Sequence, residues 1–327
     1  MKPSRIENVL GQLLKTRWPA FLWGAPGVGK SSIVRQVARA RGLEIIDIRA
    51  SLLDPTDLRG IPTIEGDKAR WCPPSFLPSV PDSSGVLFFD ELNAAPPLVQ
   101  ASLYQLMLDR RIGEYCLPSG WRVIAAGNRA EDASVMFRMP AALSNRFIHL
   151  EFEVEFEDWR KWAIDHDIQP QVLGFLSTRR ELLFDMSNPD RGFPTPRSWE
   201  MVSDILKGGL ATKELHDVIV GAVGEAAAIE FMGWCEKALS EQEMQRILKN
   251  PEKAGLPRTL GGCYALISYV TSIVKDPKVL DAAAVLVSRL KPELGVLLLR
   301  NIIQKHPRFV TNRRIASFME EHHDLIV

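Results

Sequence analysis

Short apolar runs alternate with helix-patterned segments through the first half of the chain. The runs expected to form strands are PAFLWG (19–24), LEIIDIRA (43–50), GVLFFDE (85–91), WRVIAAGN (121–128) and FIHLEFEVE (147–155). Between them, KSSIVRQVARA (30–40) and PPLVQASLYQLMLDRR (96–111) have the apolar spacing of amphipathic helices. This alternation is typical of a parallel sheet with helices packed on both of its faces.

Strand patterns nearly vanish after about Asp158. The following segments have the spacing of amphipathic helices: 158–167, 170–184, 196–206 and 216–239. A break rich in Pro and Gly, KNPEKAGLPRTLGG (249–262), precedes further helical segments. We therefore expect an α/β domain over 1–156, followed by an all-helical lid and C-terminal extension over 157–327.

The overall charge argues mildly against nucleic acid as the main partner, because Lys and Arg together equal Asp and Glu in number and the formal net charge is zero. The four cysteines are far apart and form no CxxC pair, which predicts reduced thiols in a cytoplasmic protein rather than a zinc ribbon. The N-terminal segment lacks the apolar core of a secretory signal. The most apolar stretch, about 279–303, carries five charged residues, so we expect no membrane span.

The segment GAPGVGKS fits the phosphate-binding pattern G-x-x-x-x-G-K-[ST] and lies between an expected strand and an expected helix. Its glycines allow backbone N–H groups to surround phosphates at a helix N-terminus. Lys30 is expected to reach the β- and γ-phosphates of ATP, and the Ser31 hydroxyl to ligate Mg²⁺. The residues predicted to contact the nucleotide are Gly24, Ala25, Pro26, Gly27, Val28, Gly29, Lys30, Ser31 and Ser32.

Two further expected strands end in polar residues. VLFFDE delivers Asp90 and Glu91 to the carboxyl edge of the sheet, where ligands of open α/β sheets bind. Asp90 is predicted to hold Mg²⁺ through water, and Glu91 to act as the general base. WRVIAAGN ends in Asn128, whose amide is predicted to orient water beside the γ-phosphate.

Together these motifs resemble the AAA+ superfamily and, within it, the MoxR-type ATPases. The similarity covers about Phe21–Leu206 and rests on GAPGVGKS, DPTDLRG, LFFDELNAAPPLVQ, VIAAGN, LSNRF and TPRSW. It implies a P-loop core with a helix-2 insert near 54–79, a helical lid and a homo-oligomeric, hexameric ring. It also implies a chaperone-like role in maturing or activating partner complexes, often with a von Willebrand A-domain protein, and leaves the client unknown.

The resemblance assigns roles to three further positions. Asn128 matches sensor 1, Arg146 in LSNRF matches the arginine finger, and Arg197 in TPRSW matches sensor 2. We expect Arg146 to face away from its own phosphates, and Thr195 and Pro196 to start the helix that carries Arg197. Arg129 and Arg138 remain alternative fingers.

Two segments look like additional hairpins, one within Asp54–Ser79 and one over Arg110–Trp121. Rings of this type turn such hairpins toward a central pore, but surface hairpins that pack on their own domain would have the same pattern. The paired His322 and His323 could bind metal, although a solvated terminal pair is the simpler interpretation.

The preferred function is an ATP-hydrolysing motor that remodels proteins. A nucleic-acid motor or loader is the alternative, and a basic pore would favour it. A switch-like ATP-binding scaffold is disfavoured because Asp90, Glu91, Asn128 and Arg146 occur together. A metabolic kinase is the weakest possibility, since no segment supplies an obvious acceptor site.

Overall fold

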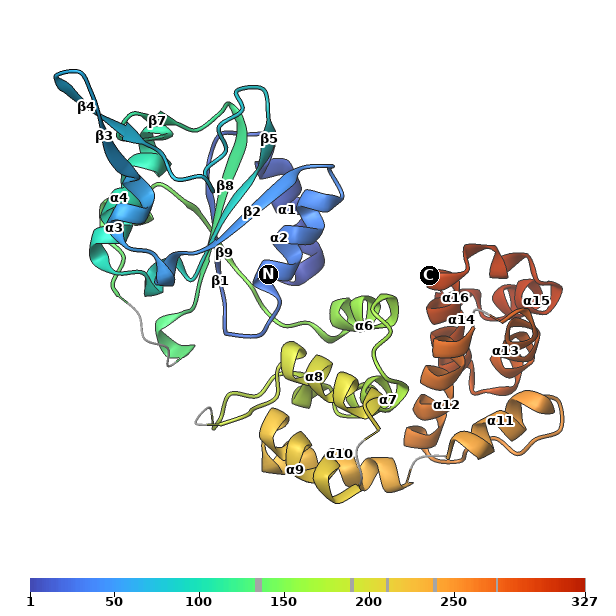
Figure 1. The fold of residues 1–327 in the computed structure, drawn as a ribbon. Helices are drawn as coiled ribbons and strands as arrows, with labels where there is room; N and C mark the ends of the chain where they lie inside the picture. Colours follow the sequence, from blue (N-terminus) through green and yellow to red (C-terminus); the bar gives the residue numbers. More distant parts are fainter. Residues whose placement is uncertain (133–136, 189–190, 210–211, 238–239, 275, 327) are drawn as a thin grey trace. The chain divides into compact units, whose positions relative to one another are not determined.

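The computed structural model shows two compact units, Met1–Glu155 and Phe156–Val327 (Figure 1). The structure describes residues 1–132, 137–188, 191–209, 212–237, 240–274 and 276–326.

A five-stranded parallel sheet forms the centre of the first unit, with the strand order β2-β5-β8-β1-β9. Its strands are β1 (Ala20–Trp23), β2 (Glu44–Arg49), β5 (Ser84–Asp90), β8 (Gly120–Gly127) and β9 (Ile148–Glu151). The run Val86–Phe89 is fully buried, as expected for a central strand covered on both faces. The predicted α/β fold is therefore confirmed, with β1 between β8 and β9 at the point where the strand order reverses.

Helices cover this sheet through apolar stripes. The helical elements of the first unit are α1 (Pro3–Leu13), α2 (Lys30–Arg39), η1 (Ala50–Leu52), α3 (Pro55–Arg59), η2 (Leu92–Ala94), α4 (Pro97–Asp109), η3 (Ala130–Asp132) and α5 (Ala141–Ser144). Helix α2 buries Ile33, Val34 and Val37 at helical spacing. Helix α1, which buries Ile6 and Leu10, was not expected from the sequence.

Two small hairpins extend the first unit. One pairs β3 (Ile61–Glu65) with β4 (Lys68–Cys72), and the other pairs β6 (Arg111–Ile112) with β7 (Tyr115–Cys116). Every residue of β3 and β4 is exposed. Both hairpins lie within the segments in which they were expected, and their orientation toward a pore stays a prediction.

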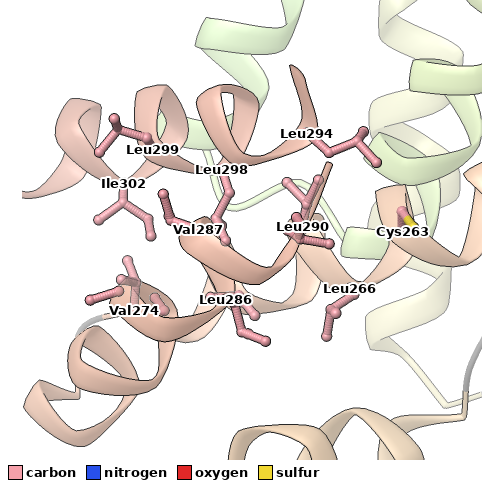
Figure 2. Close-up of a cluster of buried hydrophobic side chains, with 14 of the residues drawn as sticks. Cys263, Leu266, Val274, Leu286, Val287, Leu290, Leu294, Leu298, Leu299 and Ile302 are labelled. Carbon is pink, nitrogen blue, oxygen red and sulfur yellow. The ribbon is translucent and has the colours of Figure 1, made fainter. Parts of the chain in front are cut away.

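The second unit is helical throughout its described residues. Its elements are α6 (Phe156–Asp165), α7 (Pro170–Thr178), η4 (Arg180–Leu183), α8 (Pro196–Lys207), α9 (Thr212–Val223), α10 (Glu225–Lys237), α11 (Glu241–Lys249), α12 (Leu260–Ile273), α13 (Pro277–Arg289), α14 (Pro292–Lys305), η5 (Pro307–Thr311), α15 (Arg313–Glu321) and α16 (His323–Ile326). Leucines and valines of α12, α13 and α14 form much of one buried cluster in the C-terminal part of this unit (Figure 2).

The segment 216–239 differs from its prediction, because two helices replace the single periodic run. The break falls at Gly224, whose φ of 81° lies in the left-handed region. A Cβ at this position would stand 2.8 Å from the Gly192 carbonyl oxygen. Gly224 thus ends α9 and lets the chain pass close to the loop that precedes α8.

Candidate nucleotide-binding site

The phosphate loop connects β1 to α2 at the carboxyl edge of the sheet. Gly27 and Gly29 have φ values of 75° and 104°, which residues with a Cβ rarely adopt. Gly29 is also the N-cap of α2, so the N–H groups of the first helical turn, which have no acceptor within a helix, lie next to the loop. This arrangement can surround an anion such as a phosphate with backbone donors.

Lys30 is buried at the start of α2 and turns back into the loop. Its Nζ donates to the carbonyl oxygens of Gly24 and Ala25 over 2.6 and 2.8 Å, and to Oδ1 of Asn128 over 2.9 Å. The ammonium group therefore lies between the phosphate loop and the end of β8. The ammonium group thus brings a positive charge to the loop, where it can attract an anionic ligand.

Ser31 and Asp90 meet across the site. The Ser31 hydroxyl donates to Oδ2 of Asp90 over 2.6 Å, which joins the first turn of α2 to the end of β5. Hydroxyl and carboxylate oxygens are the hard donors that Mg²⁺ prefers. The pair therefore fits the expected magnesium site.

Glu91 follows β5 directly and has a φ of 56°, one of three described non-glycine residues with a positive φ. Such a conformation is unusual outside glycine and concentrates at functional sites. The Glu91 N–H donates to Oδ1 of Asp90 over 3.0 Å. The Ser51 hydroxyl, in the turn after β2, donates to Oε2 of Glu91 over 2.6 Å and holds the carboxylate.

The backbone of Asn128 is held by the side-chain amide of Asn93. Asn93 is 4% exposed, and its Nδ2 donates to the Asn128 carbonyl oxygen over 2.7 Å. A Cβ on Gly127 would stand 2.2 Å from Oδ1 of Asn93, so this close packing requires glycine at that position. The buried amide thus fixes the end of β8 against the turn that follows Glu91.

The three candidate finger arginines differ in their surroundings. Arg129 makes ion pairs with Glu131 and Asp132, at 3.3 and 3.4 Å. Arg138 is exposed. The guanidinium carbon of Arg146 lies 5.9 Å from the ring centre of Tyr104 on α4. Its buried Nε has no hydrogen-bond partner among the residues that the structure describes.

Arg197 belongs to the second unit. Thr195 is the N-cap of α8 and forms a capping box with Ser198, and Pro196 begins the helix. This start matches the expected one and puts the exposed Arg197 in the first turn. The capping box fixes the local backbone of Arg197 within its own unit.

Two residues of the site were missed by the sequence analysis, namely Ser51 and Asn93. Ser51 lies just beyond the carboxyl end of β2, the position that singled out Asp90 and Asn128 on their strands. Its position after a strand could therefore have identified Ser51 as a candidate site residue. Asn93 could not be identified from the sequence pattern, because its partner Asn128 lies 35 positions away, just after β8.

Other sequence expectations lie outside this site. Across the described chain, no group of three or more His, Cys, Asp and Glu residues could hold a metal ion, and the His322 ring packs against Phe318. None of the described helices is long and apolar enough to cross a membrane.

Comparison with known proteins agrees with this geometry. Residues 19–147 match the family described as AAA domain (dynein-related subfamily). Protein MoxR of Methylorubrum extorquens is 35% identical over 233 residues, which are 69% of this chain and 60% of the relative. Protein MoxR of Paracoccus denitrificans is 33% identical over 137 residues, 40% of each chain.

Midasin of Giardia intestinalis is 29% identical over 187 residues, which cover 53% of this chain and 4% of midasin. The chain therefore spans less than two thirds of each of these relatives. The Thermotoga maritima RuvB Holliday junction branch migration motor shares 18% identity over 86% of this chain and 87% of its own, with a TM-score of 0.42, so none of its features is carried over. With the phosphate loop, Asp90 and Asn128 arranged as described, the chain belongs to the MoxR-type AAA+ ATPases.

Proposed function

We propose that this chain binds ATP with Mg²⁺ at the phosphate loop and hydrolyses it to ADP and phosphate. The observation that carries the proposal is the set of hydrogen bonds by which Lys30 contacts Asn128 and Ser31 contacts Asp90. These bonds bring an ammonium, a hydroxyl, a carboxylate and an amide together beside backbone donors. Phosphoryl transfer requires this combination of charge neutralisation and positioning.

Each residue has a distinct role in the proposed reaction. Lys30 neutralises the β- and γ-phosphates, while Ser31 and Asp90 would hold Mg²⁺, which supplies electrostatic stabilisation of phosphate charge when bound. Glu91 accepts the proton of the attacking water. Asn128 orients that water or the γ-phosphate without adding charge.

The site is completed, in this proposal, by arginines from elsewhere. A second copy of the chain supplies Arg146 as the finger, which stabilises charge that spreads over the γ-phosphoryl oxygens. Two observations support Arg146 as the finger. The cation–π contact with Tyr104 holds its guanidinium group, and its Nε, which has no partner among the described residues, can still donate a hydrogen bond. Arg129 is a weaker candidate, because Glu131 and Asp132 already pair with it. Arg197 acts as sensor 2.

The experiment that tests this function mixes two inactive variants, Lys30→Ala and Arg146→Ala. At a mixed interface, the Lys30→Ala subunit still offers its arginine to the intact phosphate loop of its neighbour. We expect partial recovery of ATP turnover, since a finger in trans is worth roughly 10³–10⁵ in rate. Absence of recovery in rings shown to co-assemble would contradict a finger in trans. Repeating the mix with Arg129→Ala and Arg138→Ala tests the two alternatives.

We further propose that turnover drives a hexameric ring to remodel or activate a partner protein complex in the cytoplasm. The similarity to the two MoxR proteins supports this class of work. The partner is a von Willebrand A-domain protein. Pull-down from the native host with Glu91→Gln should recover such a protein. Recovery of stoichiometric nucleic acid without it would favour a nucleic-acid motor.

A further inference from the structure

The imidazole of His149, on the edge strand β9, bridges two segments of the site. Its Nδ1 accepts a hydrogen bond from the indole Nε1 of Trp23 over 2.8 Å. Its Nε2 lies 2.8 Å from the carbonyl oxygen of Ser144 and 3.3 Å from the Ser144 hydroxyl. Since Nδ1 accepts, the proton of the neutral ring is on Nε2 and is donated to Ser144.

Aromatic packing fixes the ring in this position. Trp23 stacks on Phe21 with ring centres 4.2 Å apart, and His149 stacks on Trp23 at 5.9 Å with 22° between the planes. Phe147 meets Phe21 edge-on at 5.3 Å. The parallel pairing of β1 with β9 brings these side chains together, because Phe21 is the register partner of His149. The two hydrogen bonds of His149 are therefore held by a packed cluster, although the residue itself is exposed.

Ser144 belongs to the turn that presents Arg146. It is the last residue of α5, and its carbonyl oxygen also accepts from the Phe147 N–H over 3.1 Å. The Arg146 N–H donates to the Leu143 carbonyl oxygen over 3.0 Å within the same turn. Any change in the contact with His149 thus acts on a backbone turn that contains Arg146.

We propose that His149 is a positioning residue for the arginine finger, and that the bridge from Trp23 through His149 to Ser144 holds the Arg146 turn in place. The bridge ties this turn to the residue that immediately precedes the phosphate loop. The proposal rests on the proposed function, in which Arg146 acts on the nucleotide of a neighbouring subunit. His149 itself touches neither the substrate nor the reacting atoms.

The role predicts an asymmetry that a general structural role would not produce. His149→Phe keeps an aromatic ring against Trp23 and removes both hydrogen bonds. In a subunit that only donates its finger, the substitution should reduce turnover at the neighbouring site. In a subunit that only accepts a finger, it should leave turnover unchanged.

The experiment uses two kinds of full-length subunit, a donor with Lys30→Ala and an acceptor with Arg146→Ala. The reference mix carries His149 in both. Adding His149→Phe to the donor should lower turnover by about 10- to 100-fold, because misplacement of a catalytic group by 1 Å can cost 10²-fold. Adding His149→Phe to the acceptor should change turnover by less than about twofold, far below the loss expected from a misplaced catalytic group, because the acceptor supplies no finger. ATP binding by the acceptor and co-assembly of both subunits are measured in parallel.

Two controls keep the outcomes separate. His166→Phe is the matched control in the donor, because His166 also stacks on a tryptophan, Trp162 on α6, and lies in the second unit. Trp23→Phe in the donor removes the indole donor and keeps a smaller aromatic ring in the stack. It should reproduce part of the loss, even if His149→Phe fails to fold.

Unchanged turnover with both donor variants, or an equal loss in donor and acceptor, would overturn the positioning role. No recovery in the reference mix would instead contradict the finger in trans, and the positioning role would fall with it.

Discussion

The Ser51 hydroxyl donates a 2.6 Å hydrogen bond to Oε2 of Glu91, and so connects the end of β2 to the residue after β5. Ser51→Ala should lower kcat by about tenfold, because loss of one hydrogen bond to a charged group is worth roughly 1.5 kcal/mol. KM for ATP should change little, since the structure gives Ser51 no contact with the phosphate loop among the described residues. Steady-state kinetics of Ser51→Ala and of the hydroxyl-preserving Ser51→Thr would check this. An unaltered kcat in Ser51→Ala would show that the bond has no part in turnover.

The outline of the first unit was accessible from sequence because the central strands β1, β5 and β8 are mostly apolar runs. Asp90 and Asn128 could be found for the same reason, since a parallel sheet brings the ends of its strands to one edge. The sequence did not predict α1. Nor did it show that the segment 216–239 breaks at Gly224, because apolar spacing does not reveal a left-handed φ or the approach of this residue to Gly192.

The contacts behind the site depend on tertiary structure. Asn93 meets Asn128, and Trp23 meets His149, across separations of 35 and 126 positions. Apolar periodicity carries no information about such pairs. Glu91 was recognised by its place after the strand, but its positive φ and its bond to Ser51 became visible only in three dimensions.

A substitution at Gly127 tests how closely the buried Asn93 side chain packs against the end of β8. Gly127→Ala would put a Cβ 2.2 Å from Oδ1 of Asn93 and 2.9 Å from Cζ of Phe21. We expect it to destabilise the protein by about 1–3 kcal/mol and to lower kcat by displacing Asn128. The added Asn93→Ala substitution should relieve part of the loss in stability, so the two effects should not be additive. Denaturant unfolding of the two single variants and the double variant measures this, and strict additivity would contradict the clash.

Two of the four free thiols should be reactive and two should be protected. Cys72 and Cys116 are exposed, whereas burial raises the pKa of Cys235 to about 12 and also raises the pKa of Cys263. At pH 8, a thiol with a pKa of about 12 is a thiolate in only about 10⁻⁴ of molecules. A thiol-reactive dye at that pH should therefore modify two cysteines rapidly. The fast phase should disappear in Cys72→Ser/Cys116→Ser, and rapid labelling of all four would contradict the burial.

Lys30→Ala should abolish ATP binding while the protein remains folded. The Lys30 ammonium neutralises phosphate charge, and its hydrogen bonds go to loop carbonyls and Asn128 rather than into the apolar core. Arg35→Ala is the matched control, because Arg35 is a cation on the same helix that instead pairs with Asp47 at 2.5 Å. Direct titration with ATP should show binding to Arg35→Ala and none to Lys30→Ala. A folded Lys30→Ala variant with normal affinity would mean that the nucleotide binds elsewhere.

Glu91 activates water, in the proposed reaction, at a site formed by Lys30, Ser31, Asp90 and Asn128. Glu91→Gln retains the shape of the side chain and its capacity to accept from Ser51, but it removes the base. ATP binding and ATP turnover of this variant are measured on the same preparation. Binding should stay close to that of the natural chain, and turnover should be slower by about 10²–10⁴-fold. Normal turnover in the Glu91→Gln variant would contradict this role of Glu91.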